Sequence, residues 1–258
     1  MTRYAAVPAD QLRNRELEAT GAPTWSECLE AVFETDPELV AEVLPPPLEP
    51  GPRSFARINI TTVRMGGTWE FGAGWFGVQA RHGDVVGEYP LFMPMTTEQA
   101  TVGGRETFGE PKKLGEVSAR RDGDHVEGRI SRLGYPLAEL RGTVGEALPL
   151  DERTSVDFYV KLSPSPERPG ELDADPLLVE SRKTHGYRVR LAVDAELVLK
   201  DSPLDPIADF PVRRIVESTW SEKTTVVQAR VLGPLPRADL LPYVHQRYDD
   251  LTVLGTSD

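Results

Sequence analysis

The sequence predicts a β-rich α+β protein in which antiparallel strands predominate and helices are few. From Ser54 onward, short segments of alternating polar and apolar residues are separated by glycine-bearing turns, as is typical of half-buried strands. The Asp-Gly pair within residues 121–124 indicates a tight hairpin, because glycine adopts positive φ angles. The 258 residues can bury a sizeable core, and strands of the same character lie on both sides of the loop at residues 163–176. We therefore expect a single domain over residues 1–258.

The N-terminal quarter is expected to be helical. Thr24 and Glu27 fit a capping box, which predicts a first helix that runs through Phe33. Asp36, followed by proline at the first helical position, predicts a second short helix over about 36 to 44. Three consecutive prolines follow this segment and end it.

Most of the remaining chain is predicted to form antiparallel sheet. A helix is expected only over residues 97–103, and the Pro- and Ser-rich stretch 163–176 is typical of an exposed loop. The alternating segments predict strands over residues 55–63, 75–80, 85–95, 116–120, 125–133, 155–162, 187–199 and 224–232.

No cofactor or metal site is predicted. Residues 72–77 match G-x-G-x-x-G, but the chain that follows alternates and then turns, so no βαβ unit can form around the motif. A glycine-rich strand is the better interpretation. Four scattered histidines lack ligand spacing, and the single Cys28 excludes an internal disulfide and a cysteine-based zinc site.

Charge and hydropathy limit the partners that we expect. The chain carries 41 acidic and 29 basic residues, a net charge of -12, and would repel a nucleic-acid backbone. It shows neither a secretory signal pattern nor an apolar run long enough to span a bilayer. These observations predict a soluble cytoplasmic protein that binds no nucleic acid and no membrane.

Two adjacent lysines, Lys112 and Lys113, follow a proline and suggest amine chemistry. A nucleophilic lysine must lose its proton, and lowering a lysine pKa from about 10.4 to about 7 takes roughly 4 to 5 kcal/mol. A second ammonium about 8 Å away supplies only about 2 kcal/mol at an effective dielectric near 20. Neighbours in an extended segment point to opposite faces, so burial must supply much of the remainder. The alternative is a pair of solvated lysines at the end of an element.

The segment 104–115 resembles the signature of the acetoacetate decarboxylase superfamily, in which G-R-E, a short spacer and P-K-K carry a Schiff-base lysine. Weaker similarity extends over residues 35–49, 87–103 and 209–216, or about four-fifths of the chain. The resemblance implies a cone-like antiparallel β-barrel with peripheral helices, assembled as a homo-oligomer. It also implies that Lys112 is the reactive lysine and that Lys113 is the neighbouring cation that favours its neutral amine.

The sequence departs from the family pattern where decarboxylases handle the substrate carboxylate. The family's arginine and two glutamates fall on Ser26, Asn59 and Ala73, although Glu70 would replace the last if the register slipped. The position before the family proline, usually aromatic, is Glu110, which would suit a general acid/base.

We therefore expect a Schiff-base-forming lyase that acts on a small keto acid or ketone. An aldolase-dehydratase condensation through an enamine, with an aldehyde as second substrate, is favoured. The alternatives are decarboxylation of acetoacetate or another β-keto acid, and a non-catalytic small-molecule binding protein on the same fold.

Further residues are candidates for the site. Arg105 and Glu106 are expected mainly to hold the lysine loop, and Tyr243, His245 and Tyr248 to close the site or form an interface. Aromatic residues in strands belong more often to the core than to a binding site. The candidates for substrate binding are Arg105, Asn59, Trp75 and Tyr89, with Phe76 and Phe92 as further aromatic residues that line the pocket.

Overall fold

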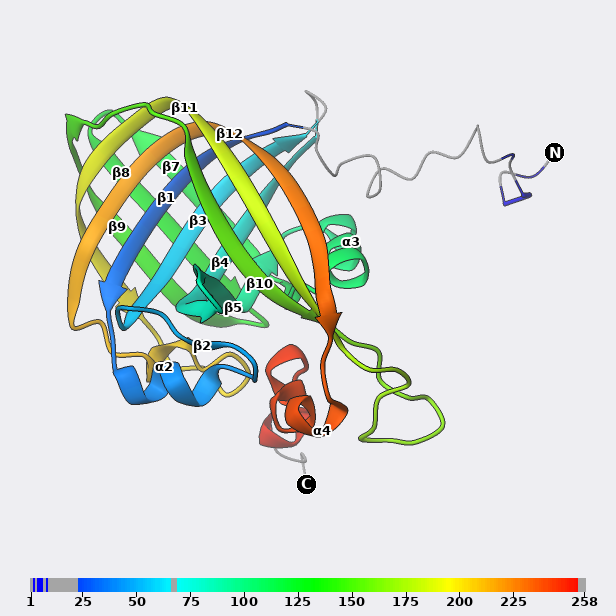
Figure 1. Ribbon diagram of the computed structural model, residues 1–258. Coiled ribbons are helices and arrows are strands. Elements are labelled where there is room, and N and C mark those ends of the chain that lie inside the picture. Colours follow the sequence, from blue (N-terminus) through cyan, green and yellow to red (C-terminus); the bar gives the residue numbers. More distant parts are fainter. Residues whose placement is uncertain (1, 3, 7, 9–22, 66–68, 255–258) are drawn as a thin grey trace.

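Seven strands form a closed ring that encloses the interior of the molecule (Figure 1). The computed structural model describes residues 2, 4–6, 8, 23–65 and 69–254. The ring follows the order β10-β5-β4-β3-β1-β12-β11 and closes where β11 pairs with β10. These strands are β1 (Thr24–Glu34), β3 (Phe55–Met65), β4 (Trp69–His82), β5 (Val85–Met95), β10 (Arg153–Lys161), β11 (Leu177–Leu199) and β12 (Arg214–Pro234).

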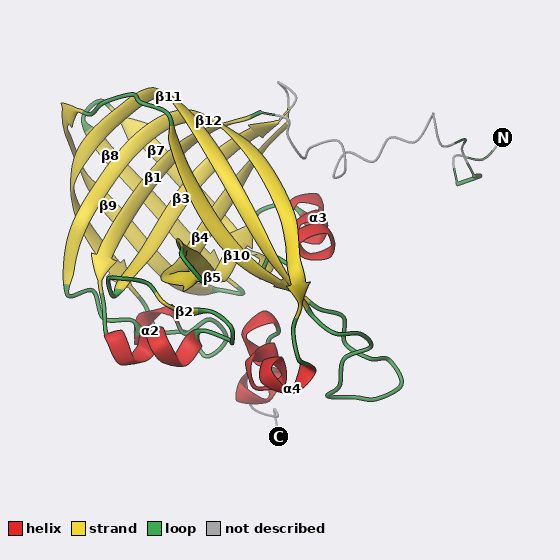
Figure 2. Ribbon diagram, viewed as in Figure 1, coloured by secondary structure: helices red, strands yellow, loops and turns green. Residues whose placement is uncertain are grey.

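Strand β11 continues beyond the ring and starts a second layer. Its residues up to Ala192 pair with β12, whereas its last residues pair with β9. The strands β9 (Tyr135–Ala147), β8 (His125–Arg132) and β7 (Glu116–Asp122) then follow in order and lie over the outside of the ring (Figure 2). The fold is thus a barrel with one wall covered by an antiparallel sheet.

The main apolar core lies between the ring and the covering sheet, because the strands alternate. On β3, Ile58 and Ile60 are fully buried, and Gly128 of β8 lies so close that a Cβ there would be 2.8 Å from Ile60 Cδ1. On β1, Leu29 and Phe33 are fully buried as well. Burial of each such side chain is worth about 1.5 to 3 kcal/mol. The alternate positions of the same strands therefore face the interior of the ring.

The ring closes through only a short contact between β5 and β10, and this place in the ring positions the lysine motif. The two strands meet at one parallel pair, Glu88 with Asp157. Farther along β5, the short β6 (Lys112–Leu114) takes the place of β10, with Met93 beside Lys112. β6 follows helix α3 (Glu98–Phe108), which lies beside the barrel (Figure 1). The motif therefore enters the barrel wall itself.

The remaining elements are short helices and one short strand. They are α2 (Pro37–Val43), β2 (Glu49–Pro50), α4 (Arg237–Leu240), and the 3-10 helices η2 (Ile207–Asp209), η3 (Leu241–Arg247) and η4 (Leu251–Leu254).

The predicted β-rich fold class is confirmed, and one helix prediction is wrong. Residues Thr24–Glu34 form β1, which pairs with β3 on one side and β12 on the other. The capping-box pattern is a local signal, and the cross-strand pairs of an interior strand outweigh it. The second helix is confirmed, with Asp36 Oδ1 accepting a hydrogen bond from Glu38 N at 3.1 Å.

The other local predictions are confirmed with shifted boundaries. Gly123 has a φ of 59° in the β7–β8 turn, and the G-x-G-x-x-G segment lies inside β4. β11 and β12 begin about ten residues earlier than predicted. The early part of β11 carries Glu180, Arg182 and Lys183, and the early part of β12 carries Glu217 and Glu222, and this polarity hides the strand pattern.

Candidate active site

A glycine at the end of helix α3 sets the direction of the lysine strand. Gly109 has a φ of 80°, and a Cβ there would lie 2.5 Å from Lys161 Cα. Glu110 N donates to Gly104 O at 3.2 Å, and Pro111 cannot continue the helix. The chain therefore leaves the helix abruptly and enters β6 two residues later.

The side chains of Glu110 and Lys112 meet over Gly104. Lys112 Nζ lies 2.7 Å from Glu110 Oε2, and the two side chains are 15% and 11% exposed. The contact is an ion pair that lacks hydrogen-bond alignment. A Cβ on Gly104 would lie 2.6 Å from Lys112 Nζ and would also collide with Glu110. Glycine is unfavourable inside a helix, so its presence here indicates that the helix backbone must leave room for this pair.

Two arginines fix the backbone of the lysine loop. Arg105 donates to Lys112 O at 2.9 Å and to Arg247 O at 3.2 Å, and its guanidinium lies 5.3 Å from the ring centroid of Tyr248. Arg247 is buried and donates to Gly109 O and, at 3.0 Å, to Val160 O. The C-terminal segment therefore buttresses the loop from outside the barrel.

Lys113 points away from Lys112. Its ammonium donates to Asp205 Oδ1 at 2.8 Å and to Asp249 Oδ1 at 2.9 Å. Arg132 contacts the same two carboxylates. Two carboxylates thus balance two cations in a buried cluster, so the charge of Lys113 is compensated locally, and this weakens its expected effect on Lys112.

Lys112 lines a cavity of about 270 Å³ inside the ring. Ser26, Asn59 and Ala73 also line it, so the positions expected to have lost the family charges do face this space. Glu70 is not among the described lining residues, and it forms an exposed pair with Arg64 at 2.6 Å. The other described lining residues include Thr61, Phe71, Trp75, Met93, Met95, Phe108, Glu110, Lys183, His185, Lys223 and Thr225.

The candidates for substrate contact separate into two groups. Asn59 and Trp75 line the cavity, and the Arg57 guanidinium stacks 4.1 Å from the Trp75 ring centroid. Tyr89 and Arg105 are not among the described lining residues. Tyr89 donates to Gln246 Oε1 at 3.0 Å, and Arg105 is occupied by the loop carbonyls. The polar atoms of Tyr89 and Arg105 are therefore used outside the cavity, and a direct substrate contact by either residue stays a prediction.

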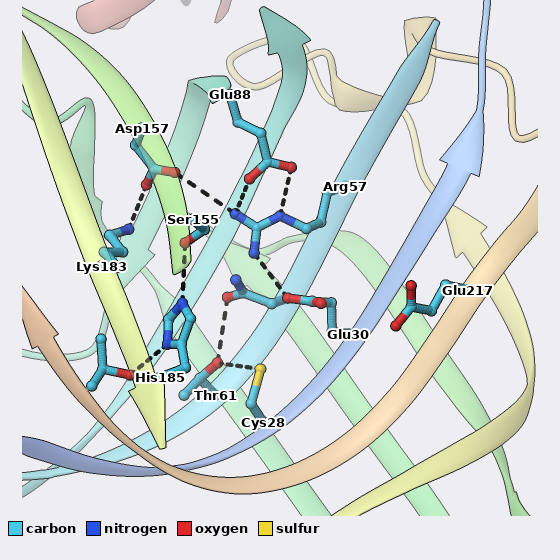
Figure 3. Close-up of polar contacts among 12 residues, drawn as sticks. Cys28, Glu30, Arg57, Thr61, Glu88, Ser155, Asp157, Lys183, His185 and Glu217 are labelled. Carbon is cyan, nitrogen blue, oxygen red and sulfur yellow. Dashed lines mark hydrogen bonds and ion pairs between the residues drawn. The ribbon is translucent and has the colours of Figure 1, made fainter. Parts of the chain in front are cut away.

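A charged cluster lies deeper in the ring, around Arg57 (Figure 3). Arg57 pairs with Glu30 at 2.8 Å and with Glu88, and it lies 3.9 Å from Asp157. Burial raises the pKa of Glu30, but Arg57 and Lys223 outweigh it and lower that pKa to about 2. Burial, together with Asp157, raises the pKa of Glu88 to about 7 despite the arginine. One carboxylate of the cluster is therefore firmly ionised and the other titrates near neutrality.

Tyr159 lies between this cluster and Glu110. It is buried, and its hydroxyl donates to Asp157 Oδ2 at 2.9 Å. Burial, with the neighbouring Asp157 and Glu110, raises the pKa of Tyr159 well above its ordinary value. Asp157 in turn pairs with Lys183. The phenol thus stays protonated between two carboxyl groups.

His185 is held neutral beside the cavity. Its ring nitrogens lie 3.0 Å from Ser155 Oγ and 2.9 Å from Thr225 Oγ1. Burial, followed by the charges of Lys223, Lys183 and Arg57, lowers the pKa of His185 from 6.5 to about 3, although Glu30 opposes the shift. A neutral imidazole donates through one nitrogen and accepts through the other, which suits two hydroxyl partners.

This lowered pKa predicts a pH dependence of stability. The histidine takes up a proton below pH 6.5 in the unfolded chain but only near pH 3 in the folded protein, so stability falls as pH drops through that window. We expect His185→Gln to remove ~2 kcal/mol of the stability difference between pH 7 and pH 4.5, measured by urea unfolding at both values.

The difference in unfolding free energy between pH 7 and pH 4.5 must be compared between variants, because Glu88 changes stability in the opposite direction over this range. Its pKa is raised to about 7, so it adds stability as pH falls from 7 toward 4.5. Substitution of the exposed His125 by glutamine provides the matched control and should leave the difference unchanged. An unaltered difference in His185→Gln would contradict the assignment.

Several residues of the site were not predicted from the sequence. Arg57 and Thr61 of β3 alternate with buried apolar residues, whereas Lys183 and His185 of β11 alternate with Arg182, Thr184 and Gly186. The period-2 pattern of β3 was the available signal. A polar face of a strand normally faces solvent, so this pattern alone does not indicate a site.

Two further findings concern ligands and membranes. Within the described residues, no three histidine, cysteine or acidic side chains gather in a way that could hold a metal ion. None of the helices that the structure describes is both long and apolar enough to cross a bilayer.

Comparison with known proteins gives the family. Residues 8–232 match the family model described as acetoacetate decarboxylase (ADC). The acetoacetate decarboxylase of Burkholderia cenocepacia is 27% identical over 207 residues, which cover 74% of this chain and 79% of that protein. The acetoacetate decarboxylase structure from Legionella pneumophila superimposes with a TM-score of 0.73 at 18% identity, over 83% of this chain and 88% of that one.

The fold is also shared with a protein of a different name. The enduracididine biosynthesis enzyme MppR, solved with pyruvate, superimposes with a TM-score of 0.70 at 17% identity, over 82% of this chain and 90% of that one. It was also solved with the condensation product of pyruvate and imidazole 4-carboxaldehyde. At these identities the structures demonstrate the common fold, and the family match extends over most of the sequence. The chain belongs to the acetoacetate decarboxylase family.

Proposed function

We propose that the protein is a Schiff-base-forming lyase in which Lys112 attacks the carbonyl of a small keto acid or ketone. The observation that carries the proposal is the Lys112–Glu110 ion pair, 2.7 Å long, on the wall of the cavity inside the ring. A proton that moves from the ammonium to the carboxylate within this pair leaves a neutral amine and an adjacent acid. Both groups are needed at once for imine formation.

The first half of the reaction forms the iminium ion. The Lys112 nitrogen bonds to the carbonyl carbon, and the carbonyl oxygen takes up the proton that Glu110 received. Glu110 then removes a proton from the attached nitrogen, which gives the neutral carbinolamine, and passes this proton to the hydroxyl group. The hydroxyl group leaves as water while the nitrogen lone pair forms the C=N bond. The iminium ion withdraws electrons from the neighbouring carbon and so stabilises a carbanion there.

We favour condensation as the second half of the reaction. Glu110 removes a proton from the carbon next to the iminium carbon, and the enamine formed attacks an aldehyde. Loss of the new hydroxyl group as water and hydrolysis of the imine then release the product. Two observations support this choice: Glu110 adjoins the amine, and the positions that carry the family's carboxylate-handling charges are Ser26, Asn59 and Ala73. The condensation product bound to MppR supports it by analogy.

Decarboxylation is the second candidate, because the family and its curated relative carry that name. In that reaction the bond to the carboxyl carbon breaks, CO₂ leaves, and its bonding electrons enter the iminium system. The resulting enamine is then protonated.

Borohydride trapping tests the imine proposal. We expect pyruvate with cyanoborohydride to add one reduced pyruvate to the intact protein, detected by mass spectrometry, and to add none to Lys112→Ala. Lys200→Met, outside the cavity, is the matched control. If pyruvate, acetoacetate and acetone all give no adduct, the imine proposal is wrong. The protein would then be a small-molecule binding protein that lacks this chemistry.

The reaction type is tested on the same preparation. Condensation predicts that pyruvate and an aromatic aldehyde give an unsaturated keto acid with a new ultraviolet absorbance. Rapid CO₂ release from acetoacetate without such a product would instead support decarboxylation.

A further inference from the structure

Lys223 is a cation inside the barrel that the mechanism above does not use. It lies on β12 opposite Ser26 of β1 and Tyr187 of β11, and its side chain lines the same cavity as Lys112. Its ammonium lies 5.8 Å from the Tyr187 ring centroid. β6 and β12 belong to different walls of the barrel, so the two ammonium groups approach the cavity from different directions.

The other cations that line this cavity have carboxylate partners. Lys112 pairs with Glu110, Lys183 with Asp157, and Arg57 with Glu30 and Glu88. Among the residues that the structure describes, Lys223 makes no ion pair and no hydrogen bond through its ammonium. A charge removed from water without a partner is costly, and the cost is recovered when an anion binds.

The charge of Lys223 is retained in the folded protein. Burial opposes it, but the nearby Cys28 and Glu30 outweigh burial and raise the pKa of the ammonium above its ordinary value. The cavity therefore carries a protonated ammonium group, although the protein as a whole has a net charge of -12.

The carboxylates that line the two cavities beside Lys223 favour one position for an anionic ligand. Lys223 also lines a neighbouring cavity of about 300 Å³, which Glu30, Glu88 and Glu217 line as well. The described lining of the Lys112 cavity contains only one carboxylate, Glu110. An anion is therefore repelled less on the Lys112 side. An anionic ligand that places its negative group at Lys223 also keeps this group away from the carboxylate of Glu110.

We propose that Lys223 binds the negatively charged group of the substrate while Lys112 attacks its carbonyl carbon. The substrate class is thus a keto acid, bound with its carboxylate at Lys223 and its ketone at the Lys112–Glu110 pair. The proposal rests on the proposed function of Lys112 and names the residue that selects acids over neutral ketones. Ser26, Asn59 and Thr225 line the same cavity and offer polar atoms to the ligand.

The test compares acids with their neutral amides. Pyruvate and 4-oxopentanoate are each trapped with cyanoborohydride over a range of concentrations, beside pyruvamide and 4-oxopentanamide. For at least one acid, we expect Lys223→Met to raise the concentration that gives half-maximal trapping by about 10- to 100-fold, without change for its amide. Lys223→Arg should retain most of the preference, and Lys200→Met, outside the cavity, is the matched control.

A second measurement separates this proposal from the imine chemistry. Binding of 4-oxopentanoate to Lys112→Ala is followed by ligand-observed NMR, with and without Lys223→Met, after thermal unfolding has shown that both variants are folded. Binding that depends on Lys223 supports the anion site even where no imine is trapped. If Lys223→Met traps both acids as well as the unmodified protein does, the inference is wrong. The proposed role of Lys112 would be unaffected by that result.

Discussion

Replacing Glu110 by glutamine is expected to lower turnover by about 10²- to 10⁴-fold, the usual contribution of a general acid/base. Glutamine keeps the size of the side chain but can neither accept the proton of Lys112 nor return one to the carbinolamine. Glu110 is also the only carboxylate that the described residues bring to the lining of the cavity, so no neighbour replaces it there. The measurement is the steady-state rate of product formation, with the single-turnover rate of imine trapping beside it.

The matched control, Glu106, lies in helix α3, four residues before Glu110. Glu106 is exposed, so Glu106→Gln removes the same charge from α3 without touching the cavity and should leave turnover unchanged. Equal rates for Glu110→Gln and the unmodified protein would contradict the acid/base role of Glu110.

Replacing Gly104 by alanine is expected to inactivate the protein while leaving it folded. The added Cβ would lie 2.6 Å from Lys112 Nζ and would collide with the carboxylate of Glu110. Both collisions involve the ends of flexible side chains, which can move aside without disturbing the helix. Their displacement breaks the pair, and a shift of about 1 Å in a reacting group can cost about 10²-fold in rate.

Two measurements are needed for Gly104→Ala. The trapping rate should fall by about 10²-fold, while the thermal unfolding midpoint stays close to that of the unmodified protein, because alanine favours the helix. Gly145→Ala on β9 is the control, since its new Cβ would only reach Ala192 O at 3.8 Å. An active Gly104→Ala protein would show that the contact of the pair with the helix backbone is unimportant.

Much of the sheet could be predicted from local sequence because its strands alternate. The hairpin at Gly123 and the helix after Asp36 rest on turn and capping chemistry that acts within four residues. β1 could not be predicted in this way. Its partners β3 and β12 lie far away in the sequence, and their pairing outweighs the local capping pattern at Thr24.

The candidate site shows the same division between local and distant contacts. Glu110 and Lys112 are two residues apart, so their proximity was visible in the sequence. The partners of Lys113, Asp205 and Asp249, lie 92 and 136 residues farther along the chain. The interior charges, such as Lys223, lie on polar strand faces that ordinarily meet water. Only closure of the ring shows that these faces surround a cavity.

The most direct test of the account is the position of the trapped adduct. After reduction in the presence of pyruvate, the protein is digested and the modified peptide is sequenced by fragmentation, which distinguishes Lys112 from its neighbour Lys113. We expect a reduced pyruvate adduct on Lys112, with Lys113, Lys183 and Lys223 unmodified. An adduct on any of those three lysines, or an adduct of equal yield in Lys112→Ala, would contradict this expectation.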